Sequence, residues 1–129
     1  MKIEHIAIWV SELEKVKEFY EKYFRATAVD PYYNENKNFK SYFLSFEDGC
    51  RLELMHKPDI SESKQNHEKQ QLGLVHFAVS VGSKEEVDRL TTILRNDGFK
   101  ITGEPRTTGD GYYESVVLDP ENNIVEITI

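Results

Sequence analysis

Two histidines and two glutamates recur at matched places in the two halves of this 129-residue sequence. His5 is the third residue of an apolar stretch over 3–10, and His76 is the third residue of a closely similar stretch over 74–81. Glu53 and Glu126 each lie late in their half, within a short alternating apolar pattern. Imidazole nitrogens and carboxylate oxygens suit Zn, Ni, Co, Fe or Mn, and a set without cysteine argues against a structural thiolate zinc site. The four residues together favour a divalent metal site.

Each of these residues has a simpler explanation when it is taken singly. A histidine in a strand is often a hydrogen-bonded core residue, and a glutamate beside apolar neighbours is usually solvated. Neither explanation accounts for four such side chains at equivalent positions of a repeat. The pairing, rather than any one residue, therefore favours metal binding.

The elements that must position these side chains are repeated as well. In each apolar stretch the side chains alternate between two faces, which places His5 and His76 opposite the aliphatic face. Ser-x-x-Glu follows each stretch, beginning at Ser11 and at Ser83, and predicts a capping box at a helix start. Two amphipathic helices are therefore expected, ending at Phe24 and Asn96, and their apolar stripes can cover the aliphatic faces of the strands.

Both halves are expected to end in two strands around a turn, over 41–55 and 113–128. Before the second of these, 100–101 predicts a short strand and 103–111 a turn-rich loop. The chain is thus expected to be a single domain over 1–129, with a first unit at 1–56, a linker or lid at 57–72 and a second unit at 73–129. His56 and His67, among polar residues, are expected to be exposed to solvent.

Composition excludes several classes of protein. With 16 basic and 23 acidic residues the net charge is −7, so binding to a phosphate backbone lacks its usual electrostatic drive and nucleic acid is not expected as a partner. Cys50 is the only cysteine, which rules out an intrachain disulfide. The first residues lack the apolar core of a signal peptide, and no apolar run approaches the roughly 18 residues of a membrane span. A cytoplasmic protein without a membrane partner is expected.

The sequence resembles the vicinal oxygen chelate superfamily, which includes glyoxalase I, extradiol dioxygenases and the fosfomycin and bleomycin resistance proteins. The resemblance covers nearly the whole chain and is carried by His5-Ile6-Ala7, Phe19-Tyr20-Glu21-Lys22, Leu52-Glu53-Leu54, His76-Phe77-Ala78-Val79, and Asp119-Pro120-Glu121-Asn122-Asn123-Ile124-Val125-Glu126. It implies an α+β fold in which two repeated βαβββ units form an open, metal-centred barrel. It also implies that His5, Glu53, His76 and Glu126 are the metal ligands.

The His-Glu-His-Glu set is most similar to that of bacterial glyoxalase I, a lactoylglutathione lyase. This similarity implies Ni, Zn or Co as the metal, with Fe or Mn as further options, and a small substrate with two neighbouring oxygens. Glu126 or Glu53 would move a proton between adjacent carbons while the metal stabilises an enediolate. An antibiotic-sequestering binding protein and an extradiol-type dioxygenase are the alternatives. Relatives form dimers across edge strands, so a homodimer is expected.

Two positions depart from the glyoxalase I pattern. Similar enzymes have an arginine four residues after the first ligand histidine and an asparagine four residues after the first ligand glutamate, both serving glutathione. Trp9 and Lys57 stand there in this chain, which favours a substrate other than a glutathione adduct. Arg106, in the expected loop, is a further candidate for contact with an anionic substrate. Tyr113, at the start of a strand, is a candidate either for contact with substrate through its hydroxyl or for a place in the core.

Overall fold

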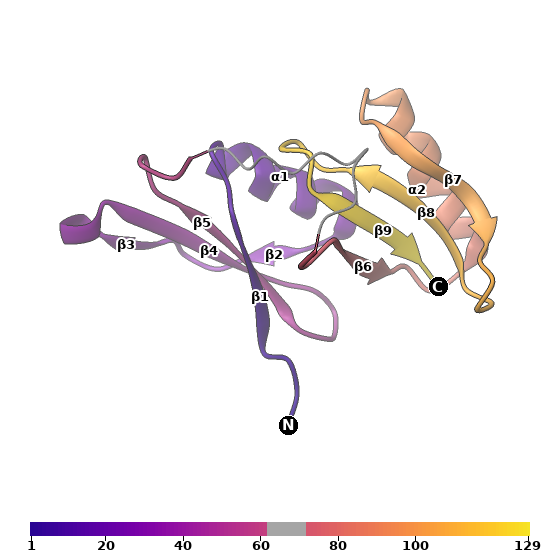
Figure 1. The fold of residues 1–129 in the computed structure, drawn as a ribbon, viewed down its shortest axis with the longest axis horizontal. Helices are drawn as coiled ribbons and strands as arrows, with labels where there is room; N and C mark the ends of the chain where they lie inside the picture. The colour runs from indigo at the N-terminus through magenta and orange to yellow at the C-terminus, as the bar shows by residue number, and fades with distance from the viewer. Residues whose placement is uncertain (62–71) are drawn as a thin grey trace. The chain divides into compact units, whose positions relative to one another are not determined.

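The computed structural model describes residues 1–61 and 72–129 of the chain, drawn as a ribbon in Figure 1. It divides into two units, Met1–Ser63 and Lys64–Ile129. Each unit has its own sheet and its own helix, and the two are described separately below.

The first unit contains the strands β1 (His5–Trp9), β2 (Thr27–Ala28), β3 (Tyr32–Asn34), β4 (Phe39–Ser45) and β5 (Arg51–His56), with the helix α1 (Leu13–Phe24) and the short 3-10 helix η1 (Glu35–Lys37). Its sheet has the order β1-β5-β4-β2, and β3 pairs with β4. β1 runs parallel to β5, whereas β5 is antiparallel to β4. The helix therefore makes the crossover that a parallel pair requires.

The second unit repeats this arrangement with β6 (His76–Ser80), α2 (Lys84–Asn96), β7 (Ile101–Thr107), β8 (Tyr113–Leu118) and β9 (Ile124–Thr128). Its sheet has the order β6-β9-β8-β7, with β6 parallel to β9 and the other pairs antiparallel. The predicted α+β fold with two βαβββ units is confirmed.

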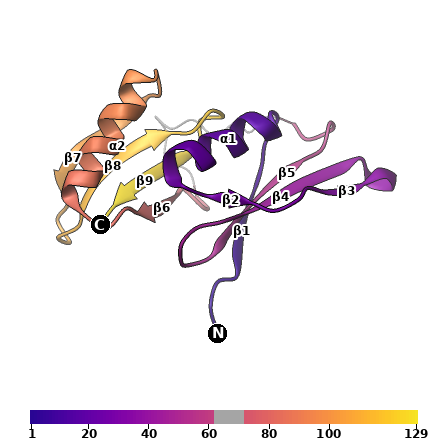
Figure 2. The same cartoon turned by 180° about the vertical axis from the view of Figure 1, so that it is seen from behind.

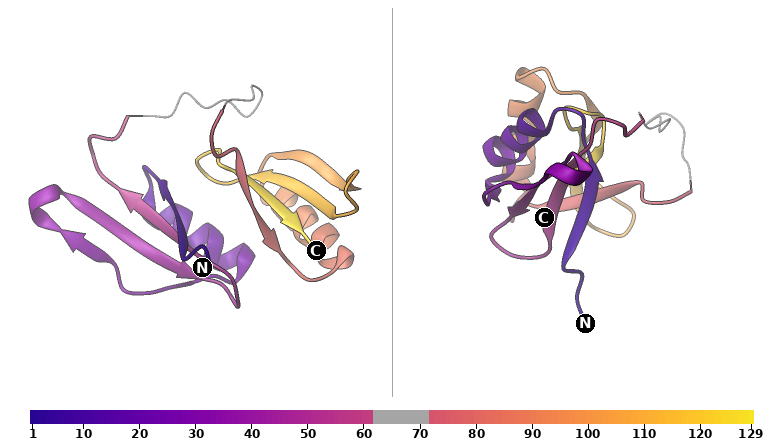
Figure 3. Two further views of the ribbon diagram at one scale, coloured as in Figure 1. Left: turned by 60° about the horizontal axis from the view of Figure 1, so that its bottom comes forward. Right: turned by 90° about the vertical axis from the view of Figure 1, so that its left-hand side faces the viewer.

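Each helix packs on one face of the sheet of its own unit. In the left view of Figure 3 the strands of each unit lie in front of its helix, and Figure 2 shows the helices from the other side. The predicted apolar stripes form the cores: Val16 and Tyr20 of α1 are fully buried with Leu44 and Leu54 of the sheet. In the second unit the fully buried core residues are Val87, Leu94, Val117, Val125 and Ile127. We call the other side of each sheet its helix-free face, and His5, Glu53, His76 and Glu126 lie on these faces.

The two helix starts differ from each other. The Ser83 hydroxyl accepts a hydrogen bond from the backbone N–H of Glu86 at 3.2 Å, which confirms the predicted cap of α2. The predicted capping box at Ser11 is wrong, because α1 begins at Leu13 after Glu12 and has no side-chain cap. Three residues separate strand from helix in both units, so Ser11 lies one residue before the capping position, which Glu12 occupies.

The predicted loop over 103–111 is also wrong in its first half, because β7 extends over Ile101–Thr107. Gly103 and Pro105 suggested a turn, yet both can occur in an edge strand, where a missing N–H is tolerated. β7 is the edge of its sheet, and its pairing with β8 shifts register between Gly103 and Arg106. Arg106 therefore belongs to a strand rather than to a loop.

Between the units, the described part of the predicted linker shows one turn, in which the Ile60 backbone N–H donates to the Lys57 carbonyl at 3.3 Å. Residues 62–71 of the predicted lid, including His67, lie outside the described residues. Among the helices that the structure describes, none is long and apolar enough to cross a membrane.

Candidate metal centre

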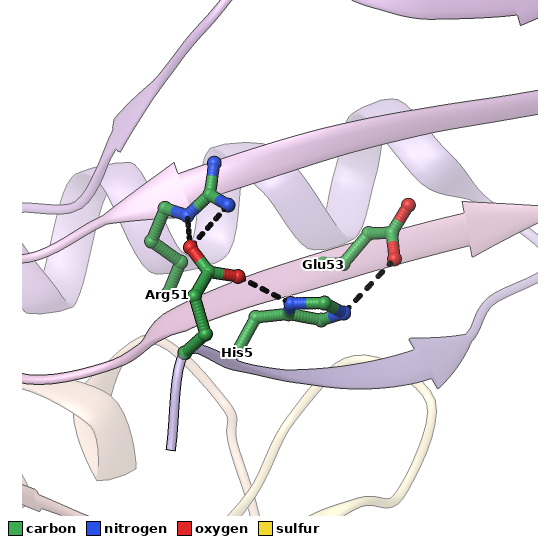
Figure 4. A network of polar contacts seen from close by, with 4 residues as sticks. His5, Arg51 and Glu53 are labelled. Carbon is green, nitrogen blue, oxygen red and sulfur yellow. Dashed lines mark hydrogen bonds and ion pairs between the residues drawn. The ribbon is translucent and has the colours of Figure 1, made fainter. Parts of the chain in front are cut away.

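The first pair of candidate ligands lies on the parallel strands β1 and β5. Their register places Ala7 of β1 opposite Glu53 of β5. His5 precedes Ala7 by two residues, so its side chain lies on the same face of the sheet as that of Glu53. The Nε2 atom of His5 lies 3.8 Å from Oε2 of Glu53, a contact marked by a dashed line in Figure 4. The imidazole is 40% exposed, whereas the carboxylate is only 14% exposed. A ring nitrogen and a shielded carboxylate oxygen are thus presented together.

The second pair repeats this geometry on β6 and β9. Ala78 lies opposite Glu126, in the same register as Ala7 and Glu53. The Nε2 atom of His76 is 3.2 Å from Oε2 of Glu126, and the two side chains are 41% and 19% exposed. Each unit therefore supplies one histidine nitrogen and one glutamate oxygen from the same pair of parallel strands.

The spacing within each pair fits a divalent metal. Two ligand atoms bound at about 2.1 Å to one ion lie about 3.0 Å apart at a right angle and about 3.4 Å apart in a tetrahedron. The 3.2 Å of the His76–Glu126 pair falls in this range. The 3.8 Å of the His5–Glu53 pair is longer by a few tenths of an ångström, which a small side-chain rotation removes. Within the described part of the chain, no group of three or more His, Cys, Asp or Glu side chains converges.

A second layer of contacts surrounds His5. Its Nδ1 atom lies 2.5 Å from Oε2 of Glu4, and the Arg51 Nε–H donates to Oε1 of Glu4 at 2.9 Å while Nη2 of the same guanidinium binds the same oxygen. The hydrogen bonds from His5 and Arg51 hold the pKa of the Glu4 carboxyl below its ordinary value. The His5 ring also meets the edge of Phe43 at 5.3 Å. The His5 ring thus has a glutamate carboxylate near each nitrogen and one aromatic ring packed against it.

Glu4 and Arg51 were not singled out from the sequence. Glu4 precedes the candidate ligand His5, and Arg51 lies directly opposite His5 in the β1–β5 ladder. The signal available in the sequence was an acidic residue next to one candidate ligand, His5, and a basic residue two positions before another, Glu53. It becomes informative only once the parallel register is known.

Glu126 has a different environment. Burial raises the pKa of its carboxyl above the ordinary value; His76 opposes this rise, and the Glu114 carboxylate adds to it. Glu114 in turn binds Arg106 at 3.3 Å across the β7–β8 ladder. The turn that leads into β9 is held by Asp119, whose Oδ1 accepts backbone N–H bonds from Glu121 and Asn123 at 2.9 Å. This turn sets the start of the strand that carries Glu126.

Comparison with known proteins fits this duplicated arrangement. The sequence profile of the Glyoxalase/Bleomycin resistance protein/Dioxygenase superfamily matches residues 2–127. The chain belongs to this superfamily. Members generally bind a divalent metal, take small-molecule substrates and form dimers.

Three relatives illustrate the similarity. The chain is 26% identical over 128 residues to the uncharacterized protein YqjT of Bacillus subtilis, covering 97% of this chain and 96% of YqjT. A possible glyoxalase from Bacillus cereus is 26% identical, with a TM-score of 0.72 and coverage of 100% and 99%. Glyoxalase I from Zea mays is 20% identical, with a TM-score of 0.76. The similarity covers 98% of the present chain but only 44% of the maize chain, so the present chain spans less than half of the maize enzyme's length.

The remaining candidate residues are placed less uniformly. Trp9 lies on the helix-free face of the first unit, 43% exposed, with its ring edge-on to Phe39 at 6.0 Å. Lys57 follows β5 and binds Asp59 at 3.1 Å. Arg106 lies on the helix-free face of the second unit, beside Glu114.

Tyr113 lies on the other side of that sheet. Its hydroxyl donates to Asp88 of α2 at 2.8 Å, and Lys84 of the same helix lies over its ring. Tyr113 is therefore on the helix side, opposite His76 and Glu126. The expectation that His56 is exposed is wrong, because its ring is half-buried and its Nδ1 contacts the Val10 carbonyl at 3.0 Å.

Proposed function

We propose that this protein is a metal-dependent lyase or isomerase of the glyoxalase I type, acting on a small substrate with two neighbouring oxygens through an enediolate. The observation that carries the proposal is the His–Glu pair repeated in identical strand register in both units. In this proposal His5, Glu53, His76 and Glu126 hold one divalent ion, with Ni, Zn or Co favoured and Fe or Mn possible as alternatives.

The bound metal would supply a Lewis acid that lowers the energy of negative charge developing on the substrate oxygens. Glu126 is the proposed general base, because burial raises its pKa and so brings its proton affinity closer to that needed near neutral pH. It takes the proton from one carbon and returns it to the adjacent carbon, so that no proton is lost overall. Glu53, equally shielded, is the alternative base.

The proposed substrate is not a glutathione adduct. Trp9 presents an exposed aromatic surface on the face that carries His5, in place of a cationic side chain. Lys57 forms an ion pair with Asp59 and carries a charge, unlike the asparagine that similar glyoxalase I enzymes have at this position. The four candidate metal ligands are retained, whereas the residues at the two glutathione-binding positions differ. This combination favours the same reaction on a substrate whose non-reacting part is not glutathione. Arg106 remains a proposed contact for an anionic group of that substrate, whereas the placement of Tyr113 argues against such a role for it.

We further propose that residues 1–129 act as a single vicinal oxygen chelate domain, as a homodimer in the cytoplasm. The dimerisation typical of the superfamily supports the homodimer. A single half-buried cysteine, which forms no intrachain disulfide, suits a reducing compartment.

The proposal is tested by turnover of nickel- and zinc-loaded protein on hemithioacetals of methylglyoxal with glutathione and with other small thiols, and on α-hydroxycarbonyl compounds. The expected result is weak or absent glutathione-dependent turnover and clear activity on another adduct, lost in Glu126→Gln. Robust glutathione-dependent turnover that is lost in this variant would show that Trp9 and Lys57 do not set the substrate. No turnover of any of these compounds by metal-loaded protein would contradict the proposed reaction and favour a binding protein.

A further inference from the structure

The two candidate half-sites match in their ligands but not in the residues behind them. In the first unit, Glu4 precedes the ligand histidine and Arg51 lies opposite it in the ladder. In the second unit the equivalent positions are Val75 and Ile124, since Ile124 lies opposite His76 in the β6–β9 ladder. At these described positions, the carboxylate and guanidinium that lie behind His5 are replaced by two aliphatic side chains behind His76.

The contacts of Glu4 determine which nitrogen of His5 carries hydrogen. A carboxylate can only accept, so Nδ1 of His5 must be the donor in its 2.5 Å contact with Glu4. In the neutral ring Nε2 is then free of hydrogen, and this is the atom that faces Glu53. Arg51 binds Oε1 of Glu4 through two nitrogens, and its guanidinium lies over the Phe43 ring at 4.2 Å, which fixes the carboxylate in place.

We propose that Glu4 and Arg51 are positioning residues that hold the His5 ring in its metal-binding tautomer and orientation, and that the described residues give His76 no such device. The inference rests on the proposed metal site. A ligand histidine that donates its other N–H to a carboxylate is fixed in orientation and made more basic, and loss of such a partner typically costs 10–100-fold in metal affinity. The two units would thus contribute unequally to binding, with the first one already arranged before metal arrives.

The first test uses nitrogen-15 NMR on metal-free protein, in which long-range couplings report the tautomer of each histidine. His5 is expected to carry its hydrogen on Nδ1, and Glu4→Ala should shift it toward a mixture of tautomers while the His76 signals stay unchanged. Glu104→Ala is the matched control, because Glu104 forms an exposed surface ion pair with Arg95 in the second unit. A His5 tautomer that is the same in wild type and Glu4→Ala would overturn the proposal.

The second test measures zinc or nickel affinity by calorimetry. Glu4→Ala is expected to weaken binding by roughly tenfold, the lower end of the usual range because the Glu4 side chain is 56% exposed. Glu4→Gln, which keeps an acceptor oxygen, should recover part of the loss, and Glu104→Ala should bind like wild type. The double variant Val75→Glu with Ile124→Arg should move the tautomer of His76 toward Nδ1–H.

The outcomes separate the two claims. If wild type binds metal and Glu4→Ala binds it equally well, the positioning role is wrong and the metal site stands. If wild type binds no metal, the proposed function is wrong, and the tautomer measurement still decides whether Glu4 controls the His5 ring.

Discussion

Glu14 of α1 links the helix of the first unit to its sheet, and its removal has a defined cost. Its Oε1 accepts from Lys40 at 3.0 Å and from the Tyr42 hydroxyl at 2.8 Å, both on β4, while Oε2 lies 2.9 Å from Lys17. Hydrogen bonds from Lys17, Lys40 and Tyr42 lower the pKa of Glu14 from 4.5 to about 2. We predict that Glu14→Gln destabilises the first unit at neutral pH.

The size of the effect follows from this pKa. A fall of about 2.5 pKa units corresponds to a ceiling of about 3.4 kcal/mol, at about 1.36 kcal/mol per unit. The Glu14 side chain is 51% exposed, so solvent screening reduces the expected loss to about 1 kcal/mol. Because the folded-state pKa is depressed, the stabilisation is fully present above pH 4.5 and disappears as the pH falls from 4.5 through about 2.

Urea unfolding followed by tryptophan fluorescence measures this directly, because Trp9, the only tryptophan, lies in the first unit. The difference between wild type and Glu14→Gln should be about 1 kcal/mol at pH 7, should shrink as the pH falls below 4.5, and should approach zero only at about pH 2 and below. Glu12→Gln is the control, since Glu12, directly before α1, binds Lys15 of that helix at 2.8 Å and is 62% exposed. A loss in Glu14→Gln that is independent of pH, or one matched by the control, would refute the reasoning.

Two further predictions concern the sheet that carries Glu126. A Cβ added at Gly103 would lie 2.8 Å from a methyl carbon of Val116, so Gly103→Ala should lower the free energy of unfolding by about 1–3 kcal/mol. A Cβ at Gly109 would meet nothing within 4 Å, so Gly109→Ala should be close to neutral, and equal melting temperatures for the two variants would contradict this reasoning. Ser115 and Thr91 are buried and hydrogen-bonded to each other at 2.6 Å, so Ser115→Ala should cost about 1–2 kcal/mol, and a stability equal to wild type would show that this bond contributes nothing.

The repeat was the most informative feature of the sequence. His5 and His76 at the same position of two similar apolar stretches predicted two equivalent units, because the alternation of a strand determines which side chains share a face. The candidate ligands Glu53 and Glu126 could be assigned to the faces opposite the aliphatic ones for the same reason. Their closeness to the histidines depends on parallel pairing of the first and last strands of each unit, which only the structure reveals.

Features that depend on register or on tertiary packing could not be predicted. Glu4 and Arg51 are 47 residues apart, and only the β1–β5 ladder brings them together. β7 was mistaken for a loop because Gly103 and Pro105 weaken strand propensity locally, while pairing with β8 outweighs that preference. Tyr113 was an open choice between cavity and core, and its bond to Asp88 on α2 decides between them only in the folded unit.

The most direct test of the metal site is the metal content of protein purified without chelator. Elemental analysis should find about one divalent ion per chain, and both His5→Ala and His76→Ala should lose it, because each unit supplies half of the ligands. Adding Ni, Co, Zn or Mn to stripped protein should raise the melting temperature, since binding to the folded state stabilises it. Undetectable metal in wild type, together with no thermal shift for any of the four ions, would contradict the proposed site.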